Sequence, residues 1–188
     1  VIAVPMGILA AYRRGTCVDM ITVSVSLLGI AIPGFLLSMF LMLFFGVHLK
    51  WLPVAGYVQM SQGILEHLRY LLLPALSLGV VQAAYITRMS RSAMLDVLYM
   101  NYIRTARAKG LKESAVVLVY GLKNAGPTIL TVVGQSFGSL VTGTIVTETL
   151  FNIPGLGMLT MTSITRRDVF VIQGVVLFVT FIYVLVNL

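Results

Sequence analysis

Charged residues are scarce in this chain of 188 residues. Only 10% of them are Asp, Glu, Lys or Arg, and 59% are apolar, whereas soluble domains carry about 25% charged and roughly 45–50% apolar residues. A soluble fold of this length could not hide that excess, because small proteins keep much of their surface in water. The composition therefore excludes disorder and argues against a water-soluble enzyme.

Residues that would support chemistry are also few. The single Cys17 excludes a disulfide framework and a thiolate metal cluster. No G-x-x-x-x-G-K-[ST] stretch is present, so we expect no ATP binding by a P-loop and no cofactor in this chain. His48 and His67 lie far apart without an H-E-x-x-H context, and no Ser/His/Asp arrangement offers acid–base or nucleophilic chemistry. We expect a chain that is not itself an enzyme.

The positions of the few charges define the expected elements. Charge-free gaps of thirty, eighteen, twenty-four and twenty residues follow Asp19, Arg69, Lys123 and Asp168, and a helix that crosses a bilayer needs about 20 apolar residues. The sequence therefore predicts an all-α, polytopic transmembrane bundle in which residues 1–188 form one domain. The predicted spans are 20–46, 70–88, 125–147 and 169–188, with a partial span at 1–12. Because Val1 is not a Met and both ends are apolar, we interpret the chain as truncated at both ends.

Lys and Arg are distributed unevenly between the two sides. With alternating spans, one side holds nine of them and a net charge of +6, and the other holds four and a net charge of +1. The positive-inside rule makes the first side cytoplasmic.

The cytoplasmic segment 89–123 is too polar to span and too long for a simple turn. Apolar residues recur in it at helical spacing from Leu95 to Ala106, and Gly110 then ends the pattern. We predict a helix, a glycine turn and a second short helix over 112–122. The segment is either a basic amphipathic linker on anionic lipid or a docking element for a cytoplasmic partner.

The third full span carries the small-residue pattern Gly134-x-x-x-Gly138. This pattern favours close helix packing within the chain, or else a helix that lines a pore or contacts another subunit. Polar side chains at membrane depth should face protein or water. On this basis we assign a translocation path to Gln135, Ser136, Thr142 and Thr144.

Prolines and glycines interrupt the apolar segments. Pro33-Gly34 predicts a kink in the first full span, and we place Pro74 in the first turn of the next span, where proline is tolerated. On the non-cytoplasmic side, the stretch 148–157 is apolar yet broken by turn residues. We expect Glu148 to reach interfacial water. A gate or loop on this side is assigned to Glu148, Pro154, Gly155 and Gly157.

The stretch from Tyr102 to Leu111, YIRTARAKGL, resembles the cytoplasmic EAA loop of binding-protein-dependent ABC importer permeases. Its general pattern is E-A-A-x-x-x-G followed by I-x-L-P. Ala106, Gly110 and Leu122 match that pattern, while other positions depart from it: Arg104 replaces the Glu, Thr105 the first Ala, Tyr120 the Ile and Lys123 the Pro. The departures are similar to the dipeptide, oligopeptide, nickel and glutathione subclass. Segments 7–15, 51–56, 148–157 and 167–174 resemble the same subclass, in particular its first permease.

The resemblance implies the type I permease fold with a helix-turn-helix coupling loop, in the bacterial cytoplasmic membrane. It also implies a second homologous permease, two cytoplasmic ATPase subunits that bind ATP and Mg, and an extracytoplasmic solute-binding protein. The expected transport is of di- or oligopeptides or a similar small solute, and no nucleic acid is involved. The coupling helix would lie within 98–109. The residues assigned to ATPase coupling are Tyr102, Arg104, Thr105, Ala106, Arg107, Ala108, Gly110 and Leu111.

Two other classes compete with this interpretation. An ion-driven secondary transporter or channel subunit usually carries carboxylates inside its spans, and here no charge lies well inside a predicted span. An intramembrane enzyme would need a catalytic constellation, which the sequence does not offer.

Overall fold

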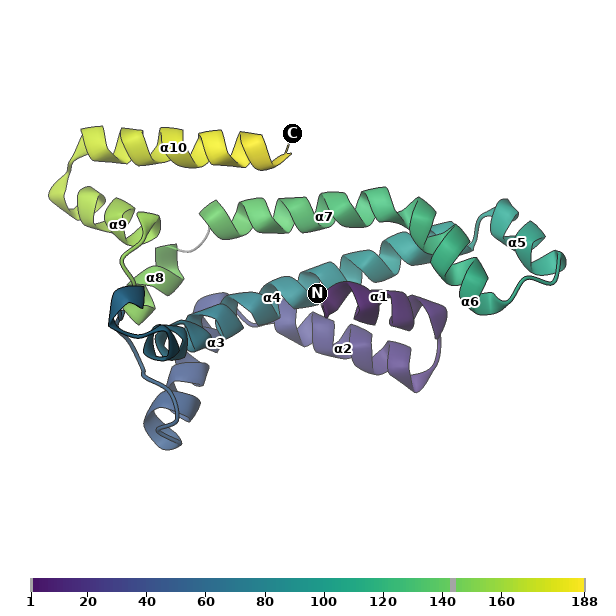
Figure 1. Cartoon of the computed structure of the whole chain (residues 1–188), viewed down its shortest axis with the longest axis horizontal. Helices are drawn as coiled ribbons and strands as arrows, with labels where there is room; N and C mark the ends of the chain where they lie inside the picture. The colour runs from purple at the N-terminus through teal and green to yellow at the C-terminus, as the bar shows by residue number, and fades with distance from the viewer. Residues whose placement is uncertain (1, 143–144, 188) are drawn as a thin grey trace. The chain divides into compact units, whose positions relative to one another are not determined.

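The computed structural model describes residues 2–142 and 145–187 (Figure 1). No β-strand forms over these two ranges, and the chain is a succession of helices. The main helices are α1 (Ala3–Tyr12), α2 (Cys17–Ala31), α3 (Gly34–Leu41), α4 (Ile64–Leu98), α5 (Asn101–Ala108), α6 (Glu113–Ala115), α7 (Leu122–Thr142), α8 (Ile145–Phe151), α9 (Leu156–Arg166) and α10 (Val169–Asn187). π-Helical turns extend α3 at Met42–His48 and join α6 to α7 at Val116–Gly121, and a short 3-10 turn covers Met60–Gln62. The all-α class expected from the composition is confirmed.

The helices form two compact units. The first combines Val1–Ala31 with Val81–Ser136, and the second combines Ile32–Val80 with Phe137–Leu188. Each is described by itself below. The helices α4 and α7 each contribute residues to both units.

In the first unit, α1 and α2 form a helical hairpin (Figure 1). The helix α1 contacts the second half of α4 through small residues. A Cβ built at Gly7 would come within 2.6 Å of the Thr87 carbonyl oxygen and 2.8 Å of the Ser90 Cβ. The Thr87 hydroxyl donates to the Ala3 carbonyl oxygen at 3.2 Å. Glycine is therefore needed at position 7 because the two backbones approach too closely for a side chain.

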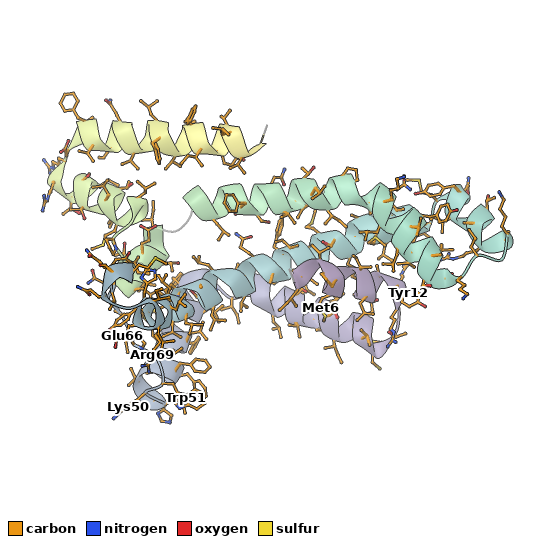
Figure 2. All side chains as sticks on the ribbon, viewed as in Figure 1. Met6, Tyr12, Lys50, Trp51, Glu66 and Arg69 are labelled. Carbon is orange, nitrogen blue, oxygen red and sulfur yellow. The ribbon has the colours of Figure 1, made fainter. Side chains whose placement is uncertain are left out.

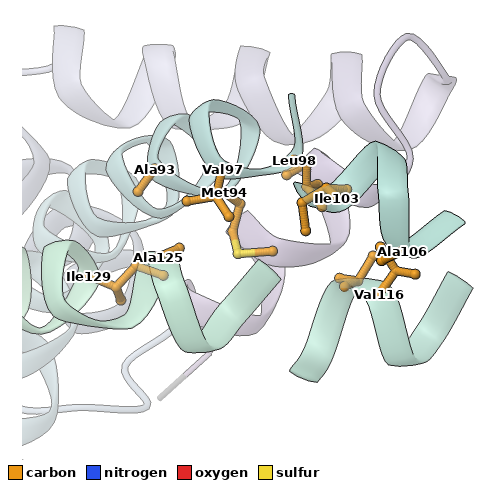
Figure 3. Packing of buried hydrophobic residues seen from close by; sticks show 11 residues of the cluster. Ala93, Met94, Val97, Leu98, Ile103, Ala106, Val116, Ala125 and Ile129 are labelled. Atoms are coloured by element: carbon orange, nitrogen blue, oxygen red, sulfur yellow. The ribbon is translucent and has the colours of Figure 1, made fainter. Parts of the chain in front are cut away.

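The core of the first unit lies where α4 ends (Figure 3). Met94 and Leu98 of α4 pack with Ile103 of α5 and Val116 of the π-helical turn, and Met94, Ile103 and Val116 have no exposed surface. Ala125 and Ile129 of α7 complete the same cluster. The cluster therefore joins four successive chain segments, and Ala11 adds α1 to it.

In the second unit, α8, α9 and α10 are joined by short turns, and α9 packs against both α8 and α10. Arg167, with φ 58°, ends α9, and the Asp168 amide donates back to the Ser163 carbonyl oxygen at 2.9 Å. The Asp168 carboxylate then accepts the Val171 amide at 3.2 Å, as an N-cap of α10 does. The pair Arg167-Asp168 thus stops one helix and starts the next.

Within residues 2–142 and 145–187, three helical runs are long and apolar enough to cross a membrane: Ile64–Leu98, Glu113–Leu140 and Val169–Val186. The helices Cys17–Ala31 and Gly34–His48 qualify as a fourth if the bent pair is taken as one span. These runs contain or overlap the four full spans expected from the charge-free gaps, and α1 corresponds to the expected partial span. The helices extend beyond the gaps because charged residues such as Glu66 and Asp96 also adopt helical conformation.

The two proline predictions have different outcomes. The kink expected at Pro33-Gly34 is confirmed, since α2 ends at Ala31 and α3 begins at Gly34. The placement of Pro74 in a first turn is wrong, because α4 begins at Ile64 and Pro74 lies in its interior. A charge-free gap reports where apolar residues begin and does not report where a helix begins.

Replacing Gly7 with Ala should destabilise the first unit by about 1–3 kcal/mol, because the new methyl group would overlap the backbone of α4. Thermal unfolding of the purified protein in detergent measures this. Gly134→Ala is the matched control, since nothing lies within 4 Å of a Cβ built at Gly134. An unfolding temperature that falls equally in both variants would contradict the close α1–α4 contact.

Candidate functional site

The helix α5 is separated from α4 by a short break. The helix α4 ends at Leu98, and Met100 is extended, with φ −70° and ψ 151°, before α5 begins at Asn101. The sequence pattern from Leu95 to Ala106 had indicated one continuous helix, so the break at Tyr99-Met100 is a correction. It allows α5 to leave the axis of α4 while its apolar residues stay buried.

The helix α5 ends in a glycine turn. The Gly110 amide donates to the Arg107 carbonyl oxygen at 2.9 Å, and the Leu111 amide donates to the Ala106 carbonyl oxygen at 3.4 Å. These two hydrogen bonds are those of a Schellman motif. Gly110 has φ 77°, and a Cβ there would meet nothing within 4 Å. The backbone angle, and not the available space, therefore requires glycine at this position.

The two faces of α5 have different surroundings (Figure 3). Ile103 and Ala106 face inward, with exposed fractions of 0% and 4%, and pack with Leu98 and Val116. The other seven assigned residues are all exposed on the helix and its turn: Tyr102, Arg104, Thr105, Arg107, Ala108, Gly110 and Leu111. Ala106 was assigned to an external contact, but the structure places it in the chain's own core. Seven of the eight assigned coupling residues are thus exposed on one element.

Arg107 forms an ion pair across the glycine turn. Its Nη2 lies 2.6 Å from Oε1 of Glu113 in α6, and its Nε donates to the same carboxylate at 3.1 and 3.2 Å. The coupling assignment implies that Arg107 meets acidic groups or carbonyls of an ATPase subunit, and in this structure Arg107 pairs with Glu113 within the loop. The side chains are 42% and 41% exposed, so the pair contributes modestly to stability. It links the start of α6 to the end of α5.

The second helix expected over 112–122 is present but does not stand alone. The α6 helix begins at Glu113 and continues through the π-helical turn into α7. A Cβ built at Gly121 would lie 3.2 Å from Met94 Cε and 3.3 Å from Leu98 Cδ2. The run that follows the glycine turn is therefore continuous with a membrane-length helix and packs against the end of α4.

Of the four residues assigned to a translocation path, the structure describes the side chains of Gln135 and Ser136, and the assignment itself stays a prediction. Gln135 is exposed, whereas Ser136 is buried and donates to the Val132 carbonyl oxygen of its own helix at 2.8 Å. The Thr142 side chain and the whole of Thr144 lie outside the described residues. Along the part of α7 that the structure describes, the assigned polar side chains thus point in different directions.

The residues assigned to the non-cytoplasmic gate do come together. Glu148 is half-buried and accepts the Met158 amide at 3.0 Å in the first turn of α9. A Cβ at Gly155 would overlap the Glu148 carboxylate, and one at Gly157 would lie 2.5 Å from the Ile145 Cα. The expectation that Glu148 reaches interfacial water stays a prediction; in this structure one oxygen of its half-buried carboxylate accepts an amide at the N-terminus of α9. Pro154 lies in the exposed turn that joins the two helices.

A second segment of the same unit meets this turn, which sequence reasoning did not predict. The Gly56 amide donates to the carbonyl oxygen of the buried Phe151 at 2.8 Å. Arg69 of α4 donates to the Trp51 carbonyl oxygen at 3.1 Å, and Figure 2 shows Lys50, Trp51, Glu66 and Arg69 in one region. Segments 51–56 and 148–157, which resemble the same family separately, are thus joined by a backbone hydrogen bond.

Comparison with known proteins identifies the class. The family model of binding-protein-dependent transport system inner membrane components matches residues 3–188, and the chain belongs to this family. It is 42% identical, over all of its length and 60% of the relative's, to a probable peptide ABC transporter permease protein of Sinorhizobium fredii. It is 38% identical, over all of its length and 62% of the relative's, to a dipeptide transport system permease protein of Escherichia coli. A di/tripeptide transport system permease protein of Pseudomonas aeruginosa is 40% identical, over 96% of this chain and 60% of that protein.

The chain spans about three-fifths of the length of these curated relatives. The membership of the family and its inner-membrane class confirm the resemblance inferred from the YIRTARAKGL stretch. The roles of individual residues stay predictions.

Replacing Glu148 with Ala should cost about 1 kcal/mol at the α8–α9 turn, because the Met158 amide loses its acceptor. Hydrogen exchange of peptides covering Leu156–Arg166 should become roughly fivefold faster at the start of that helix. Glu148→Gln, which keeps an acceptor oxygen, should exchange more slowly than Glu148→Ala. Unchanged exchange in Glu148→Ala would contradict the capping role.

Proposed function

We propose that this chain is the membrane-embedded part of a permease subunit in an ATP-driven importer of di- or oligopeptides or a similar small solute. The observation that carries the proposal is the family match over residues 3–188. The printed names of the relatives, which are peptide, dipeptide and di/tripeptide permeases, support the substrate class. The membrane is the bacterial cytoplasmic one.

The other subunits of the importer supply ATP hydrolysis, the second half of the pathway and solute delivery. Two cytoplasmic ATPases bind ATP and Mg, a second homologous permease completes the pathway, and an extracytoplasmic protein delivers the solute. The chain itself uses no cofactor. Gly134 supports the contact with a second permease, because nothing lies within 4 Å of a Cβ built there and small residues let membrane helices pack closely.

The helix α5 acts as the coupling helix. Its outward residues Tyr102, Arg104 and Thr105 enter a groove of the ATPase, and Arg104 meets an acidic group or carbonyl there. Its inward residues Ile103 and Ala106 transfer the displacement to α4 and α7 through the buried cluster. When ATP binding closes the ATPase dimer, the coupling helices are drawn together and the spans tilt so that the cavity opens outward.

The assignment of Arg104 is tested by reversing its charge. Arg104→Glu should reduce co-purification of the ATPase subunits from solubilised membranes by roughly tenfold, about 1.4 kcal/mol, and should reduce dipeptide uptake with it. Arg13→Glu is the matched control, because Arg13 is exposed on the same predicted side and lies outside α5. Equal loss in both variants would point to net charge and not to a contact of α5.

Replacing Gly110 with Val should uncouple transport from ATP hydrolysis while membrane insertion stays intact. The left-handed backbone at φ 77° costs a β-branched residue at least about 1–2 kcal/mol, so the turn would relax and α5 would be misplaced. Uptake per ATP hydrolysed in reconstituted vesicles should fall about fivefold or more.

Gly110→Asn is the control for that variant, because asparagine tolerates the left-handed region and should keep most of the uptake. Unchanged uptake in Gly110→Val would contradict the coupling assignment. Peptide uptake that persists without any ATPase subunit would instead favour an ion-driven transporter and overturn the proposed function as a whole.

A further inference from the structure

A bidentate ion pair joins α2 to α4 in the first unit. The Arg91 Nε lies 2.5 Å from Asp19 Oδ1, and Arg91 Nη2 donates to Asp19 Oδ2 at 2.9 Å. The Asp19 residue is only 5% exposed. Two parallel bonds of this kind fix both the distance and the angle between the elements that carry them.

The same carboxylate also binds the turn of the α1–α2 hairpin. The Gly15 amide donates to Asp19 Oδ2 at 3.0 Å, and Gly15 has φ 76°. Nearby in sequence, the Arg14 guanidinium lies 5.0 Å from the ring centroid of Tyr99, which directly follows α4. The hairpin turn is therefore attached to α4 and to the start of the break that precedes α5.

Arg91 lies close to the residues of α4 that hold the coupling helix. Met94 is one turn further along α4, and Leu98 one turn beyond that, and both pack with Ile103 of α5 in the buried cluster. A displacement of α5 therefore reaches the part of α4 that carries Arg91. Apolar contacts resist separation but are non-directional, whereas the ion pair also resists sliding and rotation.

We propose that Arg91 and Asp19 are a positioning pair that makes the α1–α2 hairpin move together with the coupling helix. The proposal rests on the proposed function and extends it, because it adds α2 to the elements that receive the motion of the ATPase. An ion pair is a costly way to join helices unless its charges are fully hydrogen-bonded. Here Asp19 receives three donated hydrogen bonds, two from Arg91 and one from Gly15.

The test compares neutral variants in the complete transporter, reconstituted in vesicles with its ATPases and solute-binding protein. Asp19→Asn and Arg91→Gln should each lower dipeptide uptake per ATP hydrolysed by about fivefold or more, with the permease inserted and the ATPases bound. The double variant should be no worse than either single one, because the two residues act as a unit. Arg91→Lys can keep one hydrogen bond to Asp19, so its uptake per ATP hydrolysed should lie between that of Arg91→Gln and that of the wild type.

Arg88→Gln is the matched control, since Arg88 lies on the same helix about one turn away and is exposed. It removes the same charge and should leave the ratio unchanged. Suppose that the wild type and Arg88→Gln transport peptide. If Asp19→Asn and Arg91→Gln then show unchanged uptake per ATP hydrolysed, the positioning role is overturned and the proposed function stands. If the pair variants, including Arg91→Lys, fail to accumulate or to bind the ATPases, the pair is structural and the positioning role is also overturned.

A wild-type transporter without activity in these vesicles would bear on the proposed function itself. If wild-type vesicles hydrolyse no ATP or import no peptide under these conditions, the proposed function fails. In that case the positioning role, which rests on the proposed function, is overturned with it.

Discussion

The burial of the inward face of α5 is the interaction on which the arrangement of the first unit depends. Ile103 is fully buried among residues of α4 and of the run that leads into α7, and truncating such a side chain to Ala costs about 2–5 kcal/mol. Without that contact, a helix of eight residues would be marginal in water. The outward face can therefore present polar residues only because the inward face is held in the buried cluster.

Two glycines set the geometry around this contact for different reasons. At Gly110 the backbone angle requires glycine, and the surrounding space is empty. At Gly7 the helix dihedrals are ordinary and the approach of α4 leaves no room for a methyl group. The sequence shows a glycine at both positions. The reason that glycine is required can be read only from the backbone angle and from the distance to the neighbouring helix.

Patterns along the chain predicted the helical class, the approximate spans, the helix–glycine–helix order around Gly110 and the family. They could not predict which face of α5 is buried, because Ala106 is small and suits either an internal core or an external groove. They also missed the pairing of Arg107 with Glu113 and of Arg91 with Asp19, since ion pairs depend on distances that periodicity does not report. Opposite charges on either side of Gly110 were the one available signal for the first of these pairs.

The positions of the acidic residues explain why the gaps between charged residues predicted the membrane spans. Of the six in the chain, Asp19 binds the turn between α1 and α2, and Glu113 binds across the turn before α6. Glu148 and Asp168 accept amides at the starts of α9 and α10. A carboxylate in the middle of an apolar helix would meet only saturated backbone, whereas a chain reversal offers unpaired amides and a nearby cation. Four of the six acids therefore lie where the chain turns, while Glu66 and Asp96 lie within α4 near its two ends. Acids placed at or near helix ends explain why the gaps between charges approximate the spans.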